Sequence, residues 1–136
     1  MFMKTNTQDI IFNFKNKNVV VTGGSRGIGL EVVKQFIQSG ANVICLSRTN
    51  PKLPNIKFIK CDLSKPEEIK CAFDNIDNID FLINVAGTNL CEPINVLDDK
   101  EWDRVVNTNL RSFFLTCKYA IEKMVINSYG RIVNVS

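Results

Sequence analysis

The chain has 136 residues, of which 45% are hydrophobic and 23% are charged, and its net charge is +3. This length and balance suit one folded domain with a single core and exclude a disordered chain. Because the chain contains no His, it cannot form a Ser-His or Cys-His catalytic pair or a histidine-bearing zinc site.

The cysteines and the charges narrow the class of protein further. Five widely spaced cysteines without a C-x-x-C pair indicate reduced, mostly buried thiols, and we expect no metal site. No segment is apolar enough for a signal core or a membrane span, and the basic residues are scattered among acidic ones. We therefore expect a cytoplasmic protein with neither nucleic-acid nor membrane partners. Residues 1–10 are expected to form a polar extension before a domain at 11–136.

The first half of the chain alternates strand and helix patterns. Residues 18–21 form a short apolar run and predict a buried strand, which a glycine-rich segment follows. Apolar residues then recur at helical spacing up to Ser39-Gly40, which supplies a helix stop. The apolar segments 43–46 and 58–62 predict two more strands. A strand-helix-strand order implies a parallel sheet.

The second half continues the same alternation. Ser64-x-x-Glu67 resembles a capping box and predicts a helix, and residues 81–83 predict a fourth strand. Asp98-x-x-Glu101 starts a helical stretch from 102 through 125, in which we expect Trp102 to pack against neighbouring side chains. One apolar stripe of this helix predicts its core face: Leu110, Phe113, Phe114, Cys117, Ile121 and Met124. Residues 130–135 predict a fifth strand, whose uncovered edge leads us to expect an incomplete sheet.

The glycine-rich segment Thr22-Gly-Gly-Ser-Arg-Gly-Ile-Gly29 lies between the first strand and the first helix. That context is typical of a turn that binds the phosphates of a dinucleotide. Gly23, Gly27 and Gly29 would let the backbone approach a pyrophosphate, and the N–H groups at the helix start favour negative charge. No Lys follows Gly29, which disfavours an ATPase or GTPase phosphate loop. A simple glycine-rich connection is the alternative interpretation.

Several motifs occur in the order found in one known family. TGGSRGIG at 22–29 resembles the TGxxxGxG turn of short-chain dehydrogenases/reductases, and CDLS at 61–64 is similar to their adenine-contacting segment. NVAG at 84–87 resembles their NNAG, with Val85 in place of the second Asn. EWDRVVNTNL at 101–110 resembles the helix that carries their catalytic Asn, here Asn109. The resemblance spans 11–136 and implies an α/β fold, a doubly wound parallel sheet of Rossmann type, represented by its first five strands and the intervening helices.

The resemblance also implies a role for individual residues in binding a nicotinamide dinucleotide. The implied contacts are Gly23, Ser25, Arg26, Gly27, Ile28 and Gly29 at the pyrophosphate, Ser47 and Arg48 at the ribose phosphate, Asp62 and Leu63 at the adenine, and Asn84, Ala86 and Gly87 at the inner ribose. Ser47 stands where an acidic residue would select NAD. Arg48 and Arg26 could bind a 2′-phosphate, so we expect NADP rather than NAD. The alternative is that both arginines are solvated surface groups.

The activity implied by the family is NADP(H)-dependent hydride transfer on a small carbonyl or alcohol substrate. Asn109 is the only catalytic candidate, because Ser136 aligns one residue before the family's Ser, and its Tyr and Lys follow later. Tyr119-x-x-x-Lys123 has the catalytic spacing but precedes the fifth strand, so we expect surface or subunit-contact residues there.

Three interpretations of the chain therefore remain. In the first, these 136 residues belong to an incomplete enzyme and by themselves bind the cofactor but are inactive. In the second, they form a stand-alone nucleotide-binding or regulatory module. In the third, they are a non-functional remnant. Family members commonly pair the helix at 102–125 and the following helix across a dimer interface, so the resemblance implies a homo-oligomer.

Overall fold

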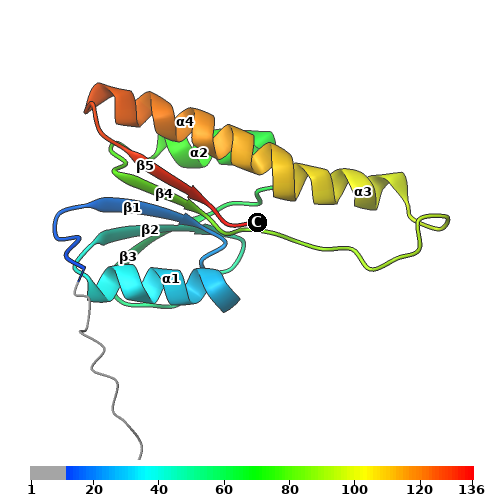
Figure 1. Cartoon of the computed structure of the whole chain (residues 1–136), viewed down its shortest axis with the longest axis horizontal. Helices are drawn as coiled ribbons and strands as arrows, with labels where there is room; N and C mark the ends of the chain where they lie inside the picture. Colours follow the sequence, from blue (N-terminus) through cyan, green and yellow to red (C-terminus); the bar gives the residue numbers. More distant parts are fainter. Residues whose placement is uncertain (1–11) are drawn as a thin grey trace, which may run out of the picture.

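A computed structural model describes residues 12–136, which form a five-stranded parallel sheet in the order β3-β2-β1-β4-β5. The strands are β1 (Asn18–Thr22), β2 (Asn42–Ser47), β3 (Ile56–Lys60), β4 (Phe81–Asn84) and β5 (Arg131–Asn134). The helices are α1 (Gly27–Gln38), α2 (Pro66–Asp74), α3 (Asp99–Val106) and α4 (Ser112–Ile126). In Figure 1, α1 covers one face of the sheet, and α2 and α4 cover the other. The predicted α/β doubly wound fold is confirmed, whereas the expected extension at 1–10 lies outside the described residues.

The central strands β1, β2 and β4 are mostly apolar and buried because helices cover both faces of the sheet. Val19 and Val21 pack in the core layer on the side of α1, and Val20 packs between the sheet and the helices α2 and α4. All three valines are 0% exposed. Neighbouring strands pair in register, so that Thr22 lies beside Leu46 and Asn84 at their carboxyl ends. The order reverses at β1, and such a switch point is where parallel sheets of this kind bind ligands.

The predicted capping box at Ser64 is wrong. Helix α2 begins at Pro66, a residue favoured at the first helical position, and Lys65 precedes it without a side-chain cap. The Ser64 hydroxyl instead donates to Oδ1 of Asp62 at 2.8 Å, and Glu68 accepts the backbone N–H of Asp62 at 2.7 Å. These local bonds stabilise the turn after β3 rather than the helix start.

The long helical stretch is interrupted where the sequence pattern predicts a continuous α-helix. It starts as predicted, because the Asp98 side chain accepts the N–H of Lys100 at 2.9 Å. After α3, a π-helical turn, η1 (Asn107–Arg111), separates α3 from α4. A π-turn inserts an extra residue into the helix and often lies at a functional site. No helix within residues 12–136 is long and apolar enough to cross a membrane.

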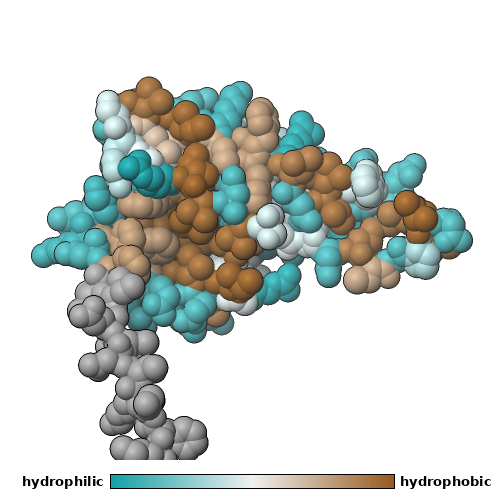
Figure 2. All heavy atoms as spheres, in the orientation of Figure 1, coloured by the Kyte–Doolittle hydropathy of each residue, from teal (hydrophilic) through white to brown (hydrophobic). Residues whose placement is uncertain are grey.

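The buried face of α4 differs from the predicted apolar stripe. The residues that face the core recur at every fourth position: Ser112, Thr116, Ala120 and Met124. Met124 is the only buried member of the predicted stripe, since Leu110 is 70% exposed, Phe114 65% exposed and Phe113 partly buried. Small side chains let the helix approach the sheet closely, and the Thr116 hydroxyl donates to Oδ1 of Asn84 in β4. Figure 2 shows apolar side chains gathered on the surface over α4 and β5.

Two other packing predictions are also wrong. Trp102, expected to pack against its neighbours, is 56% exposed on α3, a helix with no buried residue. Thiols were expected to be mostly buried, yet only Cys45 and Cys61 are, while Cys71 and Cys91 are exposed. Cys71 lies on the outer face of α2, and Cys91 lies in the long connection after β4. Neither position can be recognised from the chain's apolar pattern alone.

Candidate functional site

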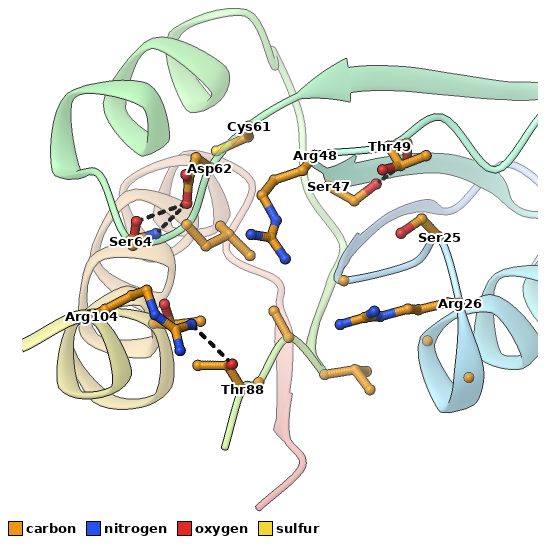
Figure 3. A pocket seen from close by; sticks show the side chains of 18 residues that line it. Ser25, Arg26, Ser47, Arg48, Thr49, Cys61, Asp62, Ser64, Thr88 and Arg104 are labelled. Carbon is orange, nitrogen blue, oxygen red and sulfur yellow. Dashed lines mark hydrogen bonds between the residues drawn. The ribbon is translucent and has the colours of Figure 1, made fainter. Parts of the chain in front are cut away.

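A cleft of about 410 Å³ opens at the carboxyl ends of β1, β2, β3 and β4 (Figure 3). Small-molecule sites usually have volumes in this range. The predicted site residues that line it are Gly23, Ser25, Arg26, Gly27, Gly29, Ser47, Arg48, Asp62, Leu63, Ala86 and Gly87. The structure thus brings together residues from four separate parts of the chain.

The turn between β1 and α1 forms one wall of the cleft and depends on its glycines. Gly23 has φ of +71°, and a Cβ there would lie 2.7 Å from the Cα of Ala86. A side chain at Gly29 would collide with the carbonyl of Gly23. Gly27 also has a positive φ, but a Cβ there would meet nothing within 4 Å. Gly23 and Gly29 thus permit close packing of the backbone, whereas Gly27 leaves open space beside the cleft.

The N-terminus of α1 presents unneutralised backbone N–H groups beside this turn. Within the described part of the chain, no side chain caps the helix, and its first turn holds no acidic residue. The exposed N–H groups and the helix dipole favour an anion at this position. Ile28, a predicted contact, does not line the cleft, and its side chain is 67% exposed on the outer side of α1. The backbone of Ile28 lies at the start of α1, but its side chain does not reach the cleft.

Two guanidinium groups reach the cleft from different elements. Arg26 comes from the glycine turn and Arg48 from the end of β2, and both side chains point toward the cavity in Figure 3. Across residues 12–136, neither guanidinium forms a side-chain hydrogen bond or an ion pair. Ser47 is 5% exposed, and its hydroxyl donates to the carbonyl of Thr49 at 2.8 Å. The cleft therefore has two cations available for an anionic ligand.

Asp62 supplies the carboxylate on the opposite side. Its Oδ1 accepts from both the backbone N–H and the hydroxyl of Ser64, at 3.0 and 2.8 Å. Partial burial disfavours its charge, but the bonds from Ser64 and the charges of Arg48 and Lys65 outweigh that effect and lower the pKa of Asp62. Beside it, burial first and nearby acidic groups second raise the pKa of the Cys61 thiol to about 12. Asp62 is therefore ionised at neutral pH, whereas Cys61 stays protonated.

Asn84 lies beneath the cleft rather than in its wall. Its side chain is 0% exposed. Its Oδ1 accepts from the Thr116 hydroxyl at 2.9 Å and from the Thr22 hydroxyl at 3.4 Å, and its Nδ2 donates to Oδ1 of Asn134 at 2.9 Å. The Thr22 oxygen in turn accepts the N–H groups of the two residues that follow Asn84. Asn84 thus ties β1, β5 and α4 to the loop that forms the cleft wall.

Asn109 lies in η1 and holds the loop after β4. Its Oδ1 accepts the backbone N–H of Thr88 at 2.8 Å, and its Nδ2 donates to the carbonyl of Thr88 at 2.7 Å. The Tyr119-x-x-x-Lys123 pair lies outside this site, because neither side chain lines the cleft. Tyr119 is half-buried, with its ring 5.9 Å from that of Phe73, so it is not a freely exposed surface residue, and a subunit contact there stays a prediction.

Several lining residues were missed by the sequence reasoning. They are Thr49, Cys61, Ser64, Val85, Thr88, Arg104 and Thr108. The sequence carried a signal for Arg104 and Thr108, because these two residues are four positions apart and therefore lie on the same face of the predicted helix. Thr88 carried no signal, since its place depends on the bonds from Asn109.

The groups that line the cleft are complementary to an anionic dinucleotide. A glycine turn and an uncapped helix start suit a pyrophosphate, and the open space at Gly27 allows a ligand to approach the backbone. Arg26 and Arg48 add positive charge, and Asp62 offers an acceptor for a polar ring or hydroxyl. These features make the cleft complementary to an elongated anion with a polar end.

Comparisons with known proteins identify the family of this chain. The short chain dehydrogenase model matches residues 17–136. The chain is 31% identical to a 3-oxoacyl-acyl-carrier-protein reductase of Chlamydia trachomatis, over 89% of this chain and 55% of that protein. It is 34% identical to NADPH carbonyl reductase 2 of Sus scrofa, over 91% of this chain and 54% of that protein. The aldohexose dehydrogenase structure of Thermoplasma acidophilum superposes with a TM-score of 0.85 at 33% identity, covering 90% of this chain and 50% of that one.

The chain thus spans about half the length of the curated relatives it matches. The match nevertheless includes nearly all of the described residues and every element of the sheet. The chain belongs to the short-chain dehydrogenase family, whose members are NAD(P)-dependent oxidoreductases.

Proposed function

We propose that this protein is an NADP(H)-dependent oxidoreductase of a carbonyl/alcohol pair. The glycine turn and α1 would hold the pyrophosphate, Asp62 and Leu63 the adenine, and Ala86 and Gly87 the inner ribose. The bound dinucleotide would supply or accept a hydride. Two relatives named as reductases act on a carbonyl group, which supports this substrate class.

The availability of Arg48 and Arg26 carries the preference for NADP. The two guanidinium groups face the same cleft, and no carboxylate follows β2 to repel a phosphate. A 2′-phosphate would form charge-assisted hydrogen bonds with them. The name of one relative, NADPH carbonyl reductase 2, agrees with this preference.

The role proposed for Asn109 is to position the loop beside the reacting end of the cofactor. Its two bonds to the Thr88 backbone hold that loop against η1. The π-turn directs backbone groups away from the regular helical pattern, so that a carbonyl could accept from a water molecule in a proton relay. Asn109 is the one catalytic candidate of the family found in these 136 residues.

Nucleotide affinity tests the cofactor proposal directly. We expect the chain to bind NADPH more tightly than NADH in a fluorescence titration. Arg48→Gln should weaken NADPH binding by about 10- to 100-fold and leave NADH binding unchanged, because a charge-assisted hydrogen bond contributes about 1.5–3 kcal/mol. Lys52→Gln, an exposed cation in the loop that follows, is the matched control. Tighter binding of NADH than of NADPH would contradict the proposal.

We further propose that these 136 residues alone bind NADPH without oxidising it. A nucleotide-binding module without catalysis is the second candidate function, favoured because every wall of the cleft comes from residues between Gly23 and Thr108. NADPH consumption with a panel of ketones and thioesters tests this, and any steady turnover would contradict it. We also propose a cytoplasmic location, because an exposed free thiol such as Cys71 stays reduced in a reducing compartment.

Self-association is the last part of the proposal. Phe114, Ile121 and Val125 are exposed on α4, the helix that resembles the subunit contact of the family. Contiguous apolar surface of this kind is typical of interfaces. Light scattering after gel filtration should show a dimer or larger species, and Phe114→Glu should reduce it to a monomer.

A further inference from the structure

Arg104 is a third guanidinium in the cleft, and it lies across the cavity from the glycine turn. It extends from α3, on the side of Asp62 and Ser64 in Figure 3, whereas Arg26 stands on the opposite side. Thr108, one helical turn further along, lines the same cavity. The helical stretch therefore turns one face toward the cavity, and Arg104 and Thr108 lie on that face.

The orientation of Arg104 is set by two neighbours before any ligand binds. Its Nε lies 2.9 Å and its Nη2 lies 2.8 Å from Oε2 of Glu101, and its Nη1 donates to the Thr88 hydroxyl at 3.1 Å. Thr88 itself is held through its backbone by Asn109. Guanidinium has five N–H donors, so donors remain for a ligand after these contacts. A group that is already oriented loses less conformational entropy when it binds.

The charge around the cleft also favours a binding role. Among the described residues that line it, the ionised groups are Arg26, Arg48, Arg104 and Asp62. Arg104 comes from α3 and lies across the cavity from the glycine turn assigned to the pyrophosphate, on the same side as Asp62. A purely structural tie between α3 and the loop would not require the guanidinium to line the cavity.

We infer that Arg104 is a further cofactor-binding residue, which contacts the adenosine half of the dinucleotide away from its 2′-phosphate. Glu101 and Thr88 act as its positioning residues. This inference rests on the proposed function, because it requires that a nicotinamide dinucleotide occupies the cleft with its adenine beside Asp62. It predicts an effect on affinity that differs from the effect of Arg48, since both NADPH and NADH carry the adenosine half.

The test compares dissociation constants of NADPH and NADH for the 136-residue chain. Arg104→Gln should weaken both by the same factor of about ten, as expected for loss of a hydrogen bond from a charged group. Thr88→Val, which removes one positioning bond, should weaken both by about threefold, and Arg104→Lys should restore part of the affinity. Arg111→Gln is the control, because Arg111 is exposed in η1 and does not line the cleft. Thermal unfolding of each variant shows whether the fold is kept.

Each outcome decides the inference. Equal affinity of the Arg104→Gln and Arg111→Gln variants would overturn it, and so would a loss restricted to NADPH, which would assign Arg104 to the 2′-phosphate. If Arg104→Gln lowers the melting temperature, Arg104→Lys decides the matter: part of the affinity should return with the fold, and a Lys variant that regains the fold with no gain in affinity would overturn the inference. If the unmodified chain binds neither dinucleotide, the proposed function itself fails together with this inference. Binding by the unmodified chain that is insensitive to Arg104 would overturn the inference alone.

Discussion

Asn84 is expected to stabilise the folded chain through its buried side-chain bonds, which Asn84→Leu would remove. Thr116 can still donate to the carbonyl of Phe113 at 3.2 Å, and Asn134 is exposed to water. Thr22, 1% exposed, loses the acceptor of its hydroxyl. One orphaned buried donor costs about 1–3 kcal/mol, and each lost bond costs about 1 kcal/mol. The free energy of unfolding should therefore fall by about 3 kcal/mol.

The change is large enough to measure by thermal unfolding. The entropy of unfolding is about 2.1 cal/mol/K per residue, so a loss of about 3 kcal/mol lowers the melting temperature of a chain of this length by about 10 °C. Circular dichroism at 222 nm follows the transition, and urea titration gives the free energy independently. Asn95→Leu is the matched control, because Asn95 is exposed in the loop before α3.

Two measurements can refute a stabilising role for the Asn84 side chain. A melting temperature within about 3 °C of the unmodified chain would show that the network contributes no net stability. A double-mutant cycle with Thr22→Val checks the assignment, because Asn84→Leu should cost about 1 kcal/mol less in the Thr22→Val background, where the hydroxyl that it orphans is already absent. Additive effects of the two substitutions would show that their side chains do not interact.

Three further results are expected. Gly23→Ala should weaken NADPH binding by at least about tenfold and destabilise the fold, because its Cβ would lie 2.7 Å from the Cα of Ala86 at a positive φ; unchanged binding in a titration would contradict this. The pKa of Asp62 is lowered by folding, so its stabilising effect is present above the ordinary Asp value and is lost as the pH falls through the lower folded pKa. The difference in melting temperature between the unmodified chain and Asp62→Asn should therefore shrink from pH 6 to pH 3, and a constant difference would refute it. Iodoacetamide at pH 8 should alkylate the exposed Cys71 and spare Cys61, whose pKa burial raises to about 12, as peptide mapping would show.

The sheet and its helices were predictable because their signals are local. A strand covered on both faces must be apolar in its buried part, as Val19, Val20 and Val21 are, and this needs no knowledge of its neighbours. The turn at Gly23 was recognisable for a similar reason, since only glycine fits a positive φ beside closely packed backbone. The order of strands and helices then left few parallel topologies to consider.

Tertiary structure alone decided which surfaces meet. Helix α4 buries Ser112, Thr116 and Ala120 because close approach to the sheet requires small side chains, although Phe114 is far more apolar. The place of Arg104 in the cleft depends on its bonds to Thr88, a residue 16 positions away in the chain. Hydropathy and spacing describe each element separately. The sequence by itself therefore determined the fold class and the glycine turn. The buried face of α4 and the far wall of the cleft were decided by packing between elements, because both are formed by residues that are distant in the chain.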